Sequence, residues 1–171
     1  EGTEAAVRYL YELGHRKIGM INGRLNTYSG RQRNKAYLET LYQCGLEVEP
    51  AFILNGGFIR ETARQEVANL LAGGTWPTAF LSANDEMALG AQEALKEHGL
   101  KVPADISLIG FDDTPAAAQM TPALTSVRLP IYDMSRTAAE TVVNLCEKEG
   151  SGFQSFAFPS LLIERDSCHT L

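Results

Sequence analysis

Short apolar runs alternate with amphipathic stretches along most of the chain. The clearest apolar runs are 18–21, 52–54, 79–81 and 106–111. Runs with few polar residues are typical of strands in a sheet that is covered on both faces. The stretches between them carry apolar residues at helical spacing, such as Met87, Ala91 and Leu95, and predict helices. This alternation predicts an α/β fold, an open parallel sheet with helices on both faces.

Local signals predict where the first two helices begin. Thr3 is a good capping residue, and Gly14 follows apolar residues at helical spacing, so we expect the first helix over 4–13. Ser29 and Gln32 form the Ser-x-x-Gln pattern of a capping box. This pattern predicts that Ser29 caps the second helix.

The rhythm changes in the last third of the chain. A strand is predicted over 125–129, and Pro130 leads into a long predicted helix over 131–149. One face of that helix is apolar, with Met134, Ala138, Val142 and Leu145. A last strand is predicted over 155–163, and Pro159 confines it to an edge or a bulge, because proline cannot donate to a ladder.

Composition narrows the class of protein. The 171 residues are 44% hydrophobic and 21% charged, enough for one substantial globular core. No apolar run approaches the length of a membrane helix, and no signal peptide is visible, so we expect a cytoplasmic protein without membrane contact. The net charge of −6 without a basic stripe argues against direct DNA binding. The missing initiator methionine and the early first helix suggest a piece of a longer protein.

No pattern for a metal or a cofactor stands out. The chain has three widely spaced cysteines without zinc-binding spacing, and we expect reduced, mostly buried thiols at Cys44, Cys146 and Cys168. The three histidines stand apart from one another in the sequence, and we expect surface or helix-end positions for His15, His98 and His169. Neither a dinucleotide-binding nor a P-loop pattern occurs. We therefore expect no cofactor and no metal.

Polar and aromatic residues follow the predicted strands. In an open parallel sheet, ligands bind outside the carboxyl ends of the strands. The loops there contain Ser29, Arg31, Arg33, Phe58, Asn84, Asp85, Asp112 and Asp113. Guanidinium, carboxylate, amide and aromatic groups suit a polyhydroxylated ring, because together they supply donors, acceptors and a stacking surface. The pattern indicates a small-ligand site along one rim.

Each of these residues also has an ordinary structural explanation. Asn84 and Asp112 can cap helices, and Phe58 can belong to the core or to a lid. The two arginines lie near a helix start, where solvated arginine is common. Asp112 and Asp113 could serve acid–base or metal chemistry, but no nucleophile, histidine partner or second acidic cluster accompanies them. We therefore do not expect an enzyme.

Five segments, in order along the chain, resemble one family of transcription regulators. They are 12–19 (ELGHRKIG), 77–90 (PTAFLSANDEMALG), 102–113 (VPADISLIGFDD), 122–127 (PALTSV) and 162–165 (LIER). They resemble the lactose-repressor (LacI/GalR) family, and the resemblance covers nearly the whole chain.

The resemblance implies a two-lobe architecture. Such regulators join a helix-turn-helix DNA-binding region to an effector-binding core of two α/β lobes, of the periplasmic-binding-protein-like (type I) fold. Residues 1–129 and 154–166 would form the C-terminal lobe of this core. The helix of 130–150 would belong to the other lobe in the intact protein. The DNA-binding domain would be absent, so DNA would be reached only through a missing N-terminal region.

The resemblance also implies ligand contacts. Arg33 matches the arginine that such repressors place on the effector, and Ser29 matches a neighbouring polar contact. Phe58 falls where an aromatic ring stacks on the ligand, Asn84 where a polar side chain reaches it, and Asp112 where a carboxylate accepts from sugar hydroxyls. The implied effector is a small carbohydrate or nucleoside-like molecule that shifts a hinge equilibrium and so DNA affinity.

The resemblance further implies a homodimer, formed through the helix after Asn84 and the segment 116–120. A different class of protein remains open as an alternative. One lobe of a periplasmic sugar-binding protein of a transport system would share this fold. An enzyme on a similar sheet is a third possibility, but no constellation of residues recommends it.

Overall fold

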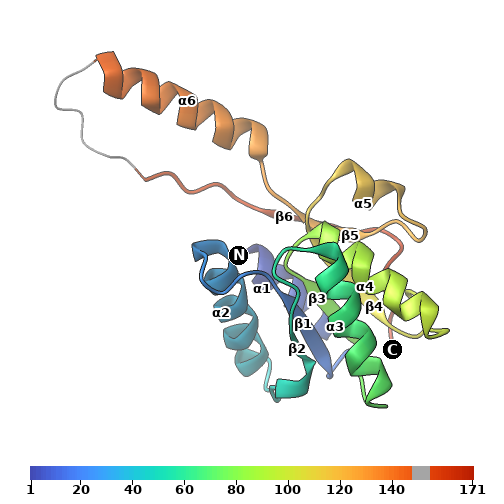
Figure 1. The fold of residues 1–171 in the computed structure, drawn as a ribbon. Coiled ribbons are helices and arrows are strands. Elements are labelled where there is room, and N and C mark those ends of the chain that lie inside the picture. The colour runs from blue at the N-terminus through green and yellow to red at the C-terminus, as the bar shows by residue number, and fades with distance from the viewer. Residues whose placement is uncertain (148–154) are drawn as a thin grey trace.

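The computed structural model describes residues 1–147 and 155–171, which form an α/β fold (Figure 1). The strands are β1 (Ile18–Asn22), β2 (Ile53–Asn55), β3 (Ala79–Ser82), β4 (Ser107–Asp112), β5 (Thr125–Arg128) and β6 (Leu161–Ile163). The helices are α1 (Gly2–Glu12), α2 (Tyr28–Gln43), η1 (Pro50–Phe52, a 3₁₀ turn), α3 (Arg60–Ala72), α4 (Asp85–Glu97), α5 (Pro115–Gln119) and α6 (Ile131–Glu147).

The strands of the described residues form one sheet in the order β2-β1-β3-β4-β5-β6. The first five pair in parallel, and β6 joins β5 antiparallel at the edge. The chain steps from β1 outward to β2 and then returns to the other side of β1 with β3. Such a reversal of strand order leaves a crevice at the carboxyl ends of the strands. The predicted open parallel sheet is confirmed, with one antiparallel edge strand added.

Helices cover both faces of the sheet, as predicted. Helix α1 packs beside α2 on one face, and α3 packs beside α4 on the other (Figure 1). Helices α3 and α4 approach closely at Gly90, where a Cβ atom would lie 2.1 Å from the carbonyl oxygen of Arg60. Gly90 is therefore needed for close helix packing.

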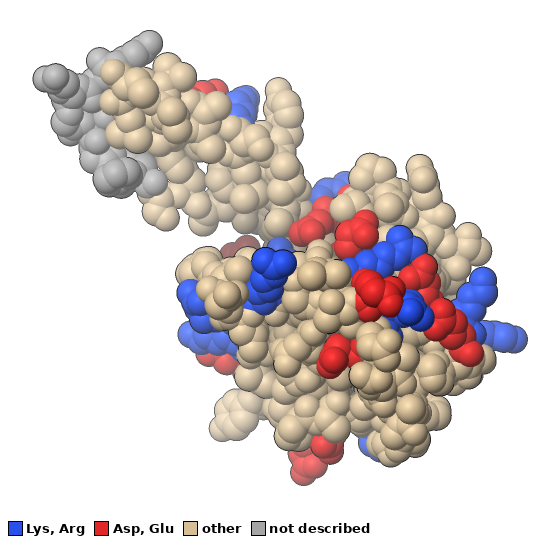
Figure 2. Space-filling model, in the orientation of Figure 1, with Lys and Arg blue, Asp and Glu red and all other residues tan. Residues whose placement is uncertain are grey.

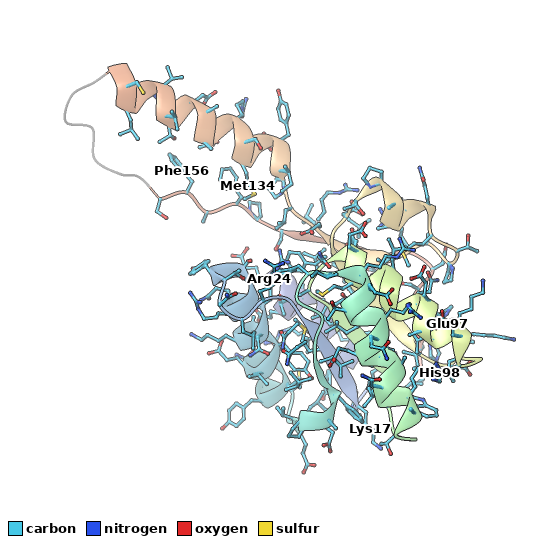
Figure 3. The ribbon with its side chains drawn as sticks, in the orientation of Figure 1. Lys17, Arg24, Glu97, His98, Met134 and Phe156 are labelled. Carbon is cyan, nitrogen blue, oxygen red and sulfur yellow. The ribbon has the colours of Figure 1, made fainter. Side chains whose placement is uncertain are left out.

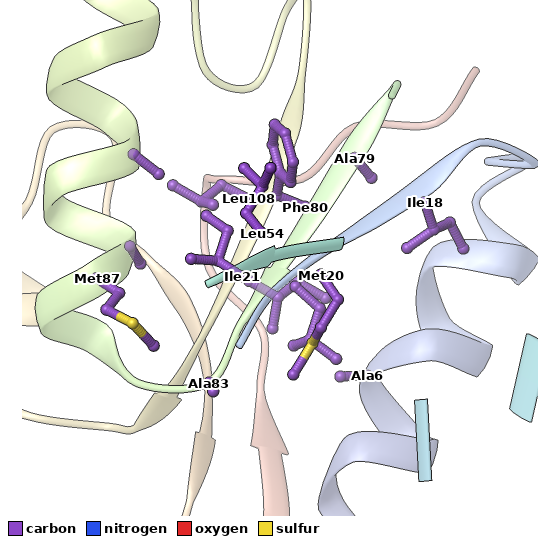
Figure 4. Packing of buried hydrophobic residues seen from close by; sticks show 14 of the residues in the cluster. Ala6, Ile18, Met20, Ile21, Leu54, Ala79, Phe80, Ala83, Met87 and Leu108 are labelled. Atoms are coloured by element: carbon purple, nitrogen blue, oxygen red, sulfur yellow. The ribbon is translucent and has the colours of Figure 1, made fainter. Parts of the chain in front are cut away.

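The hydrophobic core lies between the strands and these helices. Met20 of β1 lies on the side of α1, near Ala6, whereas Met87 of α4 lies on the opposite side (Figure 4). Met87, Ala91 and Leu95 are completely buried, so the apolar face predicted for this helix is confirmed. Burying one large apolar side chain stabilises a fold by roughly 1.5–3 kcal/mol. The two-sided core is therefore a large favourable contribution to the stability of the fold.

Both predicted helix caps are wrong by a few residues. Helix α1 begins before Thr3, which is buried in its first turn. Helix α2 is capped by Thr27, whose Oγ1 accepts from the backbone N–H of Gly30 at 3.1 Å. Thr27 also donates to the carbonyl oxygen of Arg24 at 2.7 Å, so the loop before the helix fixes the cap there. Ser29 consequently lies exposed in the first turn of α2.

Helix α6 stands apart from the sheet and the other helices (Figure 1). Helix α6 and the described residues 155–160 before β6 form an arm, on which Met134 and Phe156 lie away from the body of the molecule (Figure 3). Tyr132 is 79% exposed and Val142 59% exposed. The helix confirms the predicted one as far as Glu147, and the predicted remainder lies outside the described residues. None of the helices in the described part of the chain combines the length and hydrophobicity needed to span a bilayer.

The last strand is shorter than predicted. Strand β6 is limited to Leu161–Ile163, which pairs with residues 126–128 of β5. Strand β5 ends at Arg128, the partner of Leu161. Residues 155–160 therefore have no residue of β5 left to pair with. Pro159 stands just before the paired part, as expected of a residue that cannot donate to a ladder. The prediction of an edge strand is confirmed, but its predicted start at 155 is wrong.

Two histidines that we expected to be isolated lie together, with His15 inside the protein and His169 partly exposed beside it. His15 is completely buried; its Nδ1 lies 3.0 Å from Oγ1 of Thr78 and its Nε2 lies 2.9 Å from Oγ of Ser107. The ring centroids of His15 and His169 are 5.6 Å apart. The prediction failed because the C-terminal segment returns to the strand starts, a long-range contact that local sequence does not reveal. His98 lies at the exposed end of α4, as predicted (Figure 3).

The cysteines are more exposed than predicted. Cys44, Cys146 and Cys168 are free thiols, as expected, but Cys146 is exposed and the other two are partly exposed. Cys146 lies on α6, and the sheet and the other helices do not cover this helix. The expectation of mostly buried thiols is therefore wrong.

Candidate ligand-binding site

Arg33 of α2 joins three parts of the rim formed by the carboxyl ends of the strands. Its Nη2 lies 3.5 Å from Oδ1 of Asp112, the last residue of β4. Its Nη1 donates a hydrogen bond to the backbone carbonyl of Ala83, between β3 and α4. Its guanidinium carbon lies 3.7 Å from the centroid of the Phe111 ring. One side chain thus connects α2, the end of β3 and the end of β4.

The Arg33–Asp112 pair is partly removed from water. The Arg33 side chain is 15% exposed and the Asp112 side chain is 39% exposed. Burial lowers the pKa of Arg33 and raises the pKa of Asp112, and the attraction between the two groups offsets part of each shift. With its remaining exposure, the Asp112 carboxylate can still accept a hydrogen bond from a ligand hydroxyl.

Asp112 and Asp113 both have positive φ angles, which are rare outside glycine. Their φ angles are 105° and 54°. A non-glycine residue in such a region costs about 1–3 kcal/mol and persists only where surrounding contacts fix it, as at many ligand sites. Aspartate is one of the residues that tolerate left-handed backbone. The turn after β4 is therefore held in its conformation by the contacts around it.

A buried carboxylate, Asp85, fixes this turn. Its Oδ2 accepts from the backbone N–H of Thr114 at 2.7 Å, and its Oδ1 accepts from the hydroxyl of Ser126 at 2.6 Å. The Ser126 oxygen in turn accepts from the backbone N–H of Asp113 at 3.1 Å. Burial raises the pKa of Asp85, against the effect of these hydrogen bonds. Gly110 leaves the necessary room, since a Cβ atom there would lie 2.2 Å from Oδ1 of Asp85.

Phe58 borders the same rim from the turn between β2 and α3. Its φ angle is 65°, and its backbone N–H donates to Sδ of Met87 at 3.3 Å. Its ring packs so closely on Gly23 that a Cβ atom there would lie 2.0 Å from Cζ of Phe58. The guanidinium carbon of Arg33 lies 6.0 Å from the ring centroid. Phe58 therefore forms an aromatic wall beside Arg33.

Asn84 and Ser29 are less closely tied to this group. Asn84 caps α4, because its Oδ1 accepts from the backbone N–H of Met87 at 2.9 Å. It follows Ala83, whose carbonyl Arg33 contacts. Ser29 lies one turn before Arg33 on α2 and is exposed. Within the described residues, no hydrogen bond joins Ser29 to the other candidate residues.

Two further residues belong to the rim but were not selected from the sequence, and a third, Asp85, was placed on the rim without its buried supporting role. Phe111 lies inside an apolar strand, where nothing local marks it. Asn22 ends β1; its Nδ2 donates to Oδ1 of Asn34 at 2.9 Å, and its own Oδ1 is buried without a partner among the described residues. A polar residue that directly ends an apolar run was the available signal for Asn22.

Comparison with known proteins identifies the family to which this fold belongs. Residues 7–168 match the periplasmic binding protein-like domain. The HTH-type transcriptional repressor PurR of Haemophilus influenzae (strain PittEE) is 34% identical over 169 residues, which cover 96% of this chain and 50% of that protein. The solved complex of the transcriptional regulator CelR with cellobiose has a TM-score of 0.93 at 30% identity, covering 97% of this chain and 51% of that one.

A third similar protein is the Lac repressor dimer solved with operator and the anti-inducer ONPF. It has a TM-score of 0.88 at 32% identity and covers 98% of this chain and 57% of that one. The chain belongs to the periplasmic binding protein-like domain family, in the form found in LacI-type repressors. It spans about half the length of the curated relatives that it matches. The fold class and the resemblance inferred from the sequence are both confirmed.

Proposed function

We propose that this chain is the effector-sensing lobe of a LacI-type transcriptional regulator that binds a small sugar or nucleoside-like ligand. The observation that carries the proposal is the Arg33–Asp112 pair, 3.5 Å apart at the strand ends and flanked by Phe58. Repressor relatives on the same fold support this function over the sugar-binding lobe of a transport protein. A regulator that acts on bacterial DNA works in the cytoplasm, so we propose that location.

A ligand with several hydroxyl groups fits the chemistry of the rim. Asp112 can accept from hydroxyls, and Arg33 can donate to ligand oxygens. Phe58 offers an aromatic face to the apolar side of a sugar or base. The Oδ1 atom of Asn84 is engaged in its cap, so its NH₂ group is the part that can donate, and Ser29 adds a hydroxyl. None of these groups is a nucleophile activated by a base, so we propose binding without catalysis.

We further propose that residues 1–129 and 154–166 form one lobe of a two-lobe core. The helix of 130–150 then packs on the second lobe, and the exposed apolar side chains Tyr132 and Val142 support this arrangement. A ligand held between two lobes gains all its contacts only when they close, so it shifts a hinge equilibrium. Coupling of about 1–3 kcal/mol would reach a DNA-binding region outside this chain.

Calorimetry on the full-length protein tests the ligand site. Cellobiose, a set of monosaccharides and the four ribonucleosides are titrated, and we expect at least one of them to bind. Asp112→Asn keeps the side-chain size but removes the charge, and should weaken binding of that compound about tenfold or more, because a hydrogen bond to a charged group contributes roughly 1.5–3 kcal/mol. Glu97→Gln, the same chemical change at an exposed helix end, should leave affinity unchanged. Wild-type affinity in Asp112→Asn would contradict the site.

The same titration on the 171-residue chain alone tests the two-lobe arrangement. We expect weak binding or none, since the second lobe would supply half of the walls around the ligand. Tight binding of any of these compounds to the chain alone would contradict that arrangement.

We also propose that the protein forms a homodimer through α4 and the segment 116–120. A cavity of about 570 Å³ beside them is lined in part by Leu89, Leu100 and Met120. Charged side chains of both signs gather on the adjoining surface of α3 and α4 (Figure 2). A relative solved as a dimer supports the proposal. Analytical ultracentrifugation should give a dimer for the full-length protein and a monomer for Leu89→Glu with Met120→Glu; a wild-type monomer would contradict it.

A further inference from the structure

Asp112 and Asp113 follow each other in the turn after β4 but contact different partners. Asp112 pairs with Arg33 on the ligand-facing rim. The Asp113 side chain is only 4% exposed; its Oδ2 accepts from Nε of Arg128 at 2.6 Å and its Oδ1 accepts from Nη2 of Arg165 at 2.6 Å. Burial alone would raise the pKa of Asp113, but the hydrogen bonds from the two arginines outweigh it and lower the pKa. Asp113 is therefore a charged anchor with two charge-assisted contacts.

The two arginines stand at the two ends of the arm that carries α6. Arg128 is the last residue of β5, three residues before α6 begins. Arg165 stands two residues after β6, and its Nη1 also donates to the carbonyl oxygen of Leu124 at 2.6 Å. Arg128 and Leu161 are partners in the pairing of β5 with β6. Asp113 thus contacts both the segment that leaves the sheet and the segment that returns to it.

We propose that Asp113 is a positioning residue that couples the ligand-facing Asp112 to the two segments leading into and out of α6. A movement of α6 relative to the sheet shifts Arg128 or Arg165 and, through Asp113, rotates the turn that holds Asp112. The coupling is reciprocal, because a ligand that draws Asp112 toward itself changes the same turn. The effect of this coupling on ligand binding rests on the proposed function. The link between the turn and the two segments can be tested in this chain without a ligand.

The strained backbone makes this coupling effective. Asp112 and Asp113 both hold positive φ angles, which persist only while surrounding contacts maintain them. Those contacts are the bonds of Asp85 and Ser126 within the turn and the two arginine contacts to Asp113. Without the arginine contacts, the turn relaxes toward ordinary backbone angles and carries the Asp112 carboxylate away from Arg33.

Nuclear magnetic resonance of the ¹⁵N-labelled 171-residue chain measures the coupling without any ligand. Arg165→Lys keeps the positive charge but removes the forked donor geometry of the guanidinium, and Asp113→Asn keeps the size but removes the charge. We expect each variant to shift the Nε–Hε resonance of Arg33 and the amide resonance of Asp112. Amide exchange at 112–114 should accelerate roughly tenfold or more. Far-ultraviolet circular dichroism checks that each variant is folded.

Matched controls separate coupling from general loosening. Arg64→Lys and Glu97→Gln alter an ion pair of 3.0 Å between α3 and α4, and should leave the Arg33 resonance in place. If Asp113→Asn does not fold, Arg165→Lys decides alone. If the resonances of Arg33 and Asp112 do not move, the proposal is overturned. This holds even if the amide hydrogens of residues 161–166 exchange faster. That result would leave the ligand site untouched, because calorimetry tests it separately.

Discussion

The guanidinium group of Arg33 is stacked on the ring of Phe111, with 3.7 Å between the guanidinium carbon and the ring centroid. Phe111 is 6% exposed, so the contact is shielded from water. A cation–π interaction contributes most in such a shielded position. The same guanidinium faces Asp112, so the ring helps to fix the orientation in which Arg33 meets this carboxylate.

Phe111→Leu should therefore weaken ligand binding in the full-length protein. Leucine keeps much of the apolar volume but removes the aromatic face that orients Arg33. We expect the affinity for the compound selected from the sugar and nucleoside panel to fall about tenfold, in line with a shielded cation–π contact. Calorimetry measures the affinity, and urea denaturation measures the free energy of unfolding, which should fall by about 1 kcal/mol. Wild-type affinity in a less stable variant would argue against an orienting role.

Gly23→Ala should displace the ring of Phe58. A Cβ atom at Gly23 would lie 2.0 Å from Cζ of that ring, and overpacking of this kind costs about 1–3 kcal/mol. In a Phe58→Ala background the clash is absent, so the cost of Gly23→Ala should nearly vanish, a non-additive result expected of residues in contact. Urea denaturation gives the free energy of unfolding of four proteins: the wild type, the two single variants and the double variant. Additive costs would mean that the ring is not seated on Gly23.

His15→Gln should flatten the dependence of stability on pH. Burial lowers the pKa of His15 and outweighs its hydrogen bond to the carbonyl of His169. Below a pH of about 6.5, the ordinary value for histidine, the unfolded chain therefore binds a proton more readily than the folded chain. The stabilisation from this residue is complete above that pH and declines as the pH falls toward the lowered folded-state value.

Urea denaturation at pH values of about 7.5 and 5.5, on either side of the ordinary histidine value, measures the difference. The free energy of unfolding should fall more in the wild type than in His15→Gln. His98→Gln, at the exposed end of α4, is the matched control and should keep the wild-type change. Identical profiles for all three proteins would exclude His15 as the group responsible.

Val142→Ser tests where helix α6 packs. Val142 is 59% exposed in this chain, so the substitution should change the free energy of unfolding of the chain by less than about 0.5 kcal/mol. If the helix packs on a second lobe, the same substitution in the full-length protein buries a hydroxyl in an apolar contact and should cost about 2 kcal/mol. Val48→Ser, at another exposed valine, should cost little in both proteins. If Val142→Ser lowers the free energy of unfolding by the same small amount in both proteins, the helix does not pack on a second lobe.

The sheet was predictable because both faces are covered. A strand buried on both sides, such as β1, contains almost only apolar residues, and the face of Met87, Ala91 and Leu95 repeats at helical spacing. The turns before the helices were harder to predict from the sequence. Thr27 caps α2 in place of Ser29 because its loop folds back to the Arg24 carbonyl, which a four-residue pattern does not encode.

The meeting of Arg33, Phe58 and Asp112 on one rim also followed from the sequence. Arg33 and Asp112 end up paired because loops after parallel strands meet at one edge. The supporting residues did not follow, since their roles depend on contacts between distant segments. The two arginines on Asp113 come from positions 15 and 52 residues away, and His15 meets the chain end across 154 residues. Local periodicity contains no trace of such pairs.

The pairing of Arg128 with Leu161 places the departure and return points of the α6 arm next to each other on the sheet edge. The C-terminal segment after this arm is held by separate contacts, since the N–H of Leu171 donates to the carbonyl oxygen of Leu13 at 2.9 Å. A tight hairpin turn in place of 129–160 would then preserve the strand order. The arm could therefore be shortened or replaced in an engineered single-lobe protein.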